Sequence, residues 1–115
     1  MVSAGGMVFI PSGSYGCVAQ RVTDGKQVWK LPGYFTQVYL DNGTLYAIKL
    51  VPQDPRNHLL AIDAKTGDIR WDVRWEGDGY ELSQRLTGIT SYQQHLYLLN
   101  EKSQLVEVDP ANGAQ

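Results

Sequence analysis

One pattern recurs three times along this 115-residue chain. In each copy a run of β-forming residues leads into a short turn that ends in a glycine, at Gly25, Gly67 and Gly113. The copies are Val22–Trp29, Ile62–Trp71 and Val108–Gln115. The glycines are 42 and 46 residues apart, and such regular spacing indicates a repeated structural unit.

The length of the repeat fits either four short antiparallel strands or a pair of helices. Between the glycines the residues alternate in polarity, β-branched and aromatic types are frequent, and turn residues occur every few positions. No segment keeps a helical period of 3.6. We therefore predict an all-β fold, a partial β-propeller of about three four-stranded antiparallel blades. The blades are expected at about residues 1–31, 34–75 and 84–115, the last one incomplete.

Individual strands are also expected from the pattern. The second blade is the clearest, with strands at 35–40, 44–50, 59–63 and 68–73. Asn42-Gly43 is a favoured pair for a tight hairpin because both residues tolerate positive φ. Strands are expected at 7–11, 16–22 and 26–30 in the first blade, and at 86–91, 95–100 and 105–108 in the third.

The segment Ala61–Trp71 matches in full the AxDxxTGxxxW docking motif of quinoprotein alcohol dehydrogenases. The chain resembles the wider family of pyrroloquinoline-quinone-like propeller repeats over nearly its whole length. The first blade keeps part of the motif, and the third keeps Asp109 and Gly113 and ends before a tryptophan. The resemblance implies that a tryptophan of one blade packs against the turn of its neighbour. The residues given this structural role are Trp29, Gly25, Asp63, Thr66, Gly67 and Trp71.

The blade boundaries predict a fragment of a longer protein. The chain begins near the end of an innermost strand and stops where an outermost strand is expected, so both end blades are cut. Fewer than three blades cannot close a ring, and the end sheets would leave apolar faces and strand edges open. We expect self-association, with a homo-oligomeric ring as the alternative to the remainder of one longer chain.

Counting connections in an antiparallel meander divides them between two ends of the sheets. One end has short, similar turns; the other has longer and unlike loops, at 11–16, 31–34, 52–58, 75–84 and 101–103. Variable loops on a rigid scaffold are common sites of recognition. We predict a partner-binding surface at this second end, in the loops 52–58 and 75–81. Its candidate residues are Asp54, Arg56, His58, Trp75, Glu76, Asp78 and Tyr80.

Two readings of those loops remain open. Unpartnered, solvated loops explain the same residues, and Trp75 follows Trp71 at even spacing, which also suits packing between blades. The acidic residues Glu76, Asp78 and Glu81 lack the ligand order of a calcium loop. No metal site is predicted.

Composition and motifs argue against several kinds of chemistry. The net charge is −2, and the basic residues are scattered, which disfavours nucleic-acid binding. No apolar run is long enough to span a membrane. Cys17 is the single cysteine, His58 and His95 lie in different blades, and no GxSxG pattern is present. We therefore assign no catalytic, cofactor-binding or metal-binding residue.

The expected function is a non-enzymatic β-propeller binding or scaffold module that presents a loop face to a protein or a small ligand. The alternative is a fragment of a quinone-dependent dehydrogenase, which would bring the cofactor PQQ and calcium. Counterparts of the catalytic carboxylate, vicinal disulfide and quinone-clamping residues of those enzymes are missing from this sequence. The resemblance favours a bacterial periplasm or cell envelope.

Overall fold

A computed structural model of the chain describes residues 2–12, 16–51, 54–74, 86–100 and 105–114. These residues form strands and turns, with no helix among them. In chain order the strands are β1 (Val2–Ala4), β2 (Met7–Pro11), β3 (Cys17–Arg21), β4 (Gln27–Leu31), β5 (Tyr34–Asp41), β6 (Thr44–Val51), β7 (Asp54–Asp63), β8 (Ile69–Arg74), β9 (Leu86–Tyr92), β10 (His95–Asn100) and β11 (Leu105–Val108).

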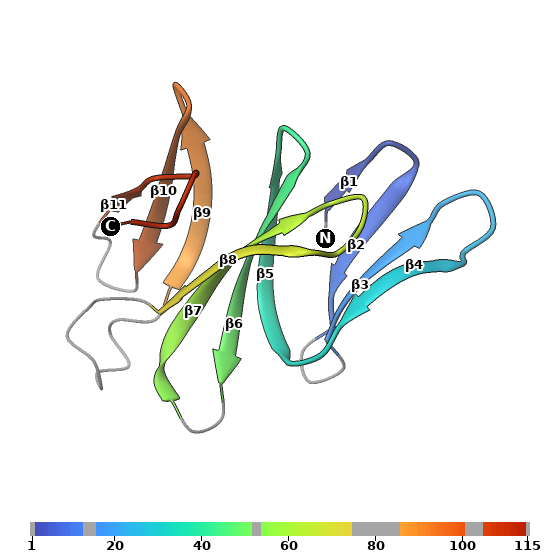
Figure 1. Cartoon of the computed structure of the whole chain (residues 1–115), viewed down its shortest axis with the longest axis horizontal. Helices are drawn as coiled ribbons and strands as arrows, with labels where there is room; N and C mark the ends of the chain where they lie inside the picture. Colours follow the sequence, from blue (N-terminus) through green and yellow to red (C-terminus); the bar gives the residue numbers. More distant parts are fainter. Residues whose placement is uncertain (1, 13–15, 52–53, 75–85, 101–104, 115) are drawn as a thin grey trace.

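The strands pair as three antiparallel meanders in chain order. The first sheet is β1-β2-β3-β4, the second is β5-β6-β7-β8, and the third, in the described part of the chain, is β9-β10-β11. Figure 1 shows the sheets side by side, and β5 contacts β1 on one side and β9 on the other. This arrangement of adjoining first strands confirms the predicted all-β, partial propeller.

Alternation along the strands produces a separate hydrophobic core at each interface between sheets, here called a seam. In the first seam Phe9, Ala19 and Trp29 of the first sheet meet Leu45 and Leu60 of the second. The second seam joins the opposite face of the second sheet to the third sheet, through Tyr46, Ile48, Leu59, Ala61, Leu96, Leu98 and Val108. The second sheet is therefore covered on both faces, as its nearly continuous apolar strands predict.

The short turns lie at one end of the sheets. Figure 1 shows the β5–β6 and β9–β10 turns toward the top and the connection from β4 to β5 toward the bottom. We call these ends the turn end and the loop end. At the turn end Asn42 and Gly43 have φ values of 49° and 79°, the left-handed pair that a two-residue hairpin requires.

One predicted loop is wrong in its extent. Residues 54–58, which we expected to lie in the loop 52–58, belong to β7. Asn57 and His58 continue the ladder to β6 by pairing with Leu50 and Lys49, and a register shift follows, so that Val51 pairs with Asp54. Pro55 misled the prediction because proline rarely occupies paired strand, but a bulge tolerates it.

Among the described residues no helix is long and apolar enough to cross a bilayer.

Candidate functional site

The first seam is fastened by an indole from the first sheet. Nε1 of Trp29 donates a hydrogen bond to the carbonyl oxygen of Ala64, at 2.9 Å. The ring lies against Gly67, where a Cβ atom would come within 2.8 Å of it. Trp29 is 8% exposed and also packs on Phe9, with ring centroids 5.9 Å apart. Glycine is required here for space as well as for its φ of +80°.

The second seam repeats the arrangement. Nε1 of Trp71 donates to the carbonyl oxygen of Pro110 at 3.0 Å, and a Cβ at Gly113 would lie 2.8 Å from the ring. Tyr46 takes the place of Phe9, with its ring centroid 6.0 Å from that of Trp71. Each tryptophan thus docks on the turn of the next sheet along the chain.

The turn on which Trp29 docks, at residues 63–68, is held in shape by its own hydrogen bonds. Oδ1 of Asp63 accepts the Lys65 N–H at 2.9 Å, and the Thr66 hydroxyl oxygen accepts the Asp68 N–H at 3.2 Å. The bond from Lys65 is the main reason why the pKa of Asp63 lies below its ordinary value, and Arg70 contributes further. The Asp63 carboxylate and Thr66 therefore shape the surface on which Trp29 docks.

Gly25 is placed differently from Gly67. Its turn belongs to the first sheet, and a Cβ built at Gly25 meets nothing within 4 Å. No indole from the described residues docks there.

Of the seven residues predicted to bind a partner, the structure describes three and places them on one strand. Asp54, Arg56 and His58 lie on β7 and not in a loop. Trp75, Glu76, Asp78 and Tyr80 lie outside the described residues, as does the acidic trio that includes Glu81. Nδ1 of His58 is 3.0 Å from Oδ1 of Asp72 on β8, and the imidazole is one-fifth exposed. His58 is therefore held against its own sheet close to the loop end.

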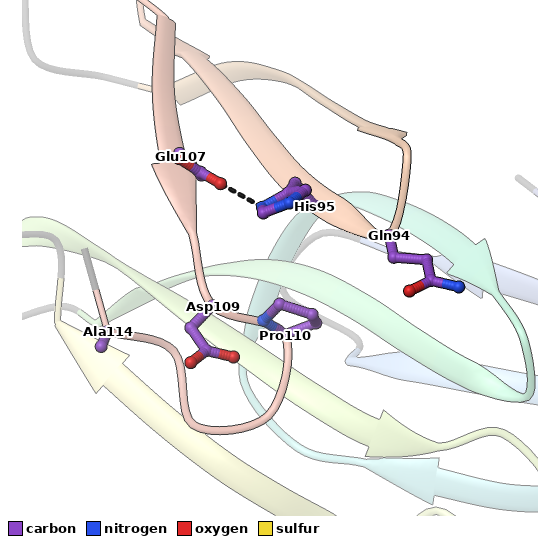
Figure 2. A pocket seen from close by; sticks show the side chains of 6 residues that line it. All are labelled: Gln94, His95, Glu107, Asp109, Pro110 and Ala114. Carbon is purple, nitrogen blue, oxygen red and sulfur yellow. Dashed lines mark ion pairs between the residues drawn. The ribbon is translucent and has the colours of Figure 1, made fainter.

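A pocket that sequence reasoning missed lies beside the third sheet. It has a volume of about 440 Å³ and is lined by Gln94, His95, Glu107, Asp109, Pro110 and Ala114. Figure 2 shows His95 on β10 facing Glu107 on β11, with an ion pair between them. Both side chains are about half exposed, at 55% and 52%.

A signal for this pocket was present in the repeat. By register, Glu107 pairs with Tyr97 as Ala61 pairs with Tyr46 and as Ala19 pairs with Phe9. The two alanines are fully buried in the seams, whereas the third copy has a charged residue at that position. Comparing the copies position by position predicts a different environment at this face.

The chemistry available in the described residues is limited. They contain no group of three or more His, Cys, Asp or Glu side chains placed to hold a metal ion. Burial raises the pKa of the Cys17 thiol to about 11, so Cys17 is protonated and a poor nucleophile near neutral pH. Burial, together with nearby Asp41, also raises the pKa of Tyr46.

Comparisons with known proteins agree with this architecture. A family model described as "Outer membrane protein assembly factor BamB" matches residues 1–115. No curated protein matches the sequence. The structure is similar to quinohemoprotein alcohol dehydrogenase ADHIIG from Pseudomonas putida HK5, with a TM-score of 0.68 and 14% identity, over 95% of this chain and 24% of that one.

It is also similar to BamB from Moraxella catarrhalis, with a TM-score of 0.61 and 17% identity, over 93% of this chain and 32% of that one. At these identities the likeness concerns the fold alone. The chain spans about a quarter and a third of the lengths of these two proteins.

Proposed function

Since the chain belongs to the PQQ-like repeat family whose model is described as the outer membrane protein assembly factor BamB, we propose that it is a protein-binding scaffold segment. In this proposal it is not an enzyme, it acts in the bacterial cell envelope, and its loop end contacts a partner protein.

The difference between the two ends of the sheets is the main support for the proposal. At the turn end, Gly67 and Gly113 receive the two docked indoles and so serve the interior of the molecule. At the loop end, the described connection between β4 and β5 receives neither of the two docked indoles. A rigid scaffold with variable connections at one end is a frequent design for recognition.

The alternative is a segment of a quinone-dependent dehydrogenase. It is favoured by the similarity to the quinohemoprotein alcohol dehydrogenase over 95% of the chain. Calcium binding would require several converging oxygen ligands, and the described residues do not supply such a cluster. The described residues therefore do not fit the calcium ion that accompanies the quinone.

Photo-crosslinking from the two ends tests the scaffold proposal. A benzoylphenylalanine at Arg74, the last residue of β8 at the loop end, is compared with one at Asn42, an exposed residue at the turn end. In a bacterial envelope fraction we expect position 74 alone to crosslink to a component of outer membrane protein assembly. Equal crosslinking from both positions, or none from position 74, would contradict the proposal.

Titration of the purified chain with PQQ and calcium separates the two functions. Indole fluorescence reports on all three tryptophans of the chain, of which Trp29 and Trp71 lie at the seams. The scaffold proposal predicts no saturable quenching by PQQ in the presence of calcium. Saturable, calcium-dependent quenching would favour the dehydrogenase.

A further inference from the structure

Arginine side chains bind the carboxylate of a turn in the first two sheets. In the first sheet, the Arg21 guanidinium donates to Oδ2 of Asp24 at 2.9 Å. In the second sheet, Nη1 of Arg70 donates to the Thr44 hydroxyl oxygen. Nη2 of the same guanidinium donates to Oδ2 of Asp63 at 3.3 Å. One planar, forked cation thus bridges the beginning of β6 and the end of β7 at the turn end.

The third sheet has the same framework at its turn end. His95 and Asp109 occupy there the places that Thr44 and Asp63 occupy in the second sheet. The equivalence follows from the buried cross-strand pair next to each set, which is Leu45–Ile62 in the second sheet and Leu96–Val108 in the third. We therefore compare the two sites atom by atom.

The aspartate of the third sheet is fixed in the same way as that of the second. Oδ1 of Asp109 accepts the Ala111 N–H at 2.9 Å, and Oδ1 of Asp63 accepts the Lys65 N–H at 2.9 Å. Within the part of the chain that the structure describes, no side chain donates to Oδ2 of Asp109. The oxygen equivalent to the one that binds Arg70 thus lacks a cation among these residues.

The pocket of about 440 Å³ lies at this aspartate. Figure 2 shows its lining, in which Asp109 is joined by His95 and Glu107. Glu107 stands where the other two sheets have a buried alanine, so the pocket has a carboxylate that the Arg70 site lacks. Oε1 of Glu107 contacts Nδ1 of His95, but a carboxylate has acceptor sites for several donors. The space and the two carboxylates suit a cation with several N–H donors.

We propose that the pocket lined by His95, Glu107 and Asp109 binds a guanidinium cation, from free arginine or from an arginine side chain of a polypeptide. One N–H donates to Oδ2 of Asp109, as in the Arg70 site, and another donates to the Glu107 carboxylate. Arginine is favoured over lysine because its planar fork reaches two acceptors at once, whereas an ammonium is a compact point charge. The pocket lies at the turn end, so the proposal does not depend on the function proposed for the loop end.

NMR of the histidine rings in the whole chain, titrated with N-acetyl-L-argininamide, tests the proposal. The chain has two histidines. His95 lines the pocket, and His58, which lies against Asp72 in the second sheet, serves as the internal control. We expect a saturable shift of the His95 ring signals with little change at His58. Absence of a saturable shift at His95, or equal shifts of both rings, would overturn the proposal.

Two further ligands test whether the guanidinium itself is recognised. N-acetyl-L-citrullinamide has nearly the same shape as the arginine compound but no charge, and it should bind at least about tenfold more weakly. N-acetyl-L-lysinamide keeps the charge but lacks the planar fork, and it should also bind more weakly. Equal affinity for the arginine compound and either of these two would contradict a guanidinium site.

Free L-arginine distinguishes the two sources of the cation. The blocked compound represents an arginine within a polypeptide, since it carries neither an α-ammonium nor an α-carboxylate. Tighter binding of the blocked compound assigns the pocket to an arginine side chain of a polypeptide. Tighter binding of L-arginine assigns it to the free amino acid. Either result supports the guanidinium site.

Three variants locate the binding in the pocket. Glu107→Gln and Asp109→Asn each remove one charge with little change of shape, and each should weaken binding of the arginine compound about tenfold. Asp41→Asn removes the same charge at an exposed residue outside the pocket lining and should leave the affinity unchanged. Unchanged affinity in both pocket variants, or an equal loss in all three, would contradict the site. The comparison of arginine with citrulline on the unmodified chain decides the matter if a variant does not fold.

Discussion

At the level of single residues, Trp29 and Trp71 each combine two interactions at a seam. The ring buries a large apolar area, and the N–H satisfies a carbonyl group of the neighbouring sheet. A buried tryptophan generally requires such a partner for its N–H. The glycine beneath each ring supplies both the space and the left-handed backbone of the turn.

Truncating these tryptophans should destabilise the chain unequally. Trp29→Ala should lower the free energy of unfolding by about 3–5 kcal/mol, the range for a large buried aromatic. Trp71 is only partly buried, so Trp71→Ala should cost less than Trp29→Ala. Trp71→Phe, which keeps a ring but leaves the Pro110 carbonyl without its donor, should cost about 1 kcal/mol. Urea unfolding followed by circular dichroism measures all three, and an unchanged stability in Trp71→Ala would contradict the docking.

Asp63 should make stability depend on pH in the acid range. Its pKa is lower in the folded chain than its ordinary value, first because of the Lys65 N–H. A lowered folded pKa gives stability that is present above the unfolded pKa, near pH 4, and is lost as the pH falls through the folded pKa. The melting temperature should therefore decrease as the pH is lowered below about 4. In Asp63→Asn this part of the drop should be absent, and an identical acid profile would refute the role of Asp63.

At the level of elements, the two described hairpins on either side of the second seam use different turn residues. The β5–β6 turn has Asn42 and Gly43, which accept a left-handed backbone readily. The β9–β10 turn has Gln93 and Gln94, with φ values of 50° and 68°. Glutamine in this conformation is strained because its Cβ crowds the following carbonyl oxygen.

Replacing the third-sheet turn should therefore stabilise the chain. Gln93→Asn combined with Gln94→Gly should raise the free energy of unfolding by about 1 kcal/mol. The reverse exchange in the second sheet, Asn42→Gln with Gly43→Gln, should lower it by a similar amount. Chemical denaturation of the two double variants checks both signs, and a destabilising Asn-Gly replacement would show that the glutamine side chains make contacts that outweigh backbone strain.

At the level of the whole molecule, both outer sheets keep apolar side chains in solvent. Val22 and Val28 are exposed on the first sheet, and Tyr92 and Leu105 on the third, with Leu105 62% exposed. The second sheet, packed on both faces, shows how such residues are covered within the chain. Exposed apolar groups of this kind favour association.

Light scattering over a concentration series should therefore give a mass that rises above the 12.8 kDa of one chain. Leu105→Lys should reduce the association, since it places a charge on the open face of the third sheet. Ala111→Lys adds the same charge in an exposed turn and should have little effect. A constant monomer mass for the unmodified chain, or equal effects of the two variants, would argue against this face as the contact.

The repeat and its spacing were enough to predict most of the fold. Strand positions such as Met7–Pro11, His95–Asn100 and Leu105–Val108 agree with the structure, because alternation and turn residues are local signals. The predicted extent of β7 was wrong, since Pro55 suggests a loop, whereas the pairing of Asn57 and His58 with β6 keeps this segment in the sheet. The pocket beside His95 and Glu107 was missed because its lining combines the β9–β10 turn, β10, β11 and the segment after β11, which only the folded sheet brings together.

By itself, the sequence determined the β class, the repeated four-stranded unit and the glycines of the turns, since each depends on neighbouring residues along the chain. Only the tertiary structure decided which surfaces meet. Trp29 reaches Ala64 across 35 residues of sequence and Trp71 reaches Pro110 across 39. The turn at Gly25, with nearly the same local bonds, has no such partner among the described residues. A turn sequence encodes its own backbone, but an indole docks on it only where packing of whole sheets brings the two together.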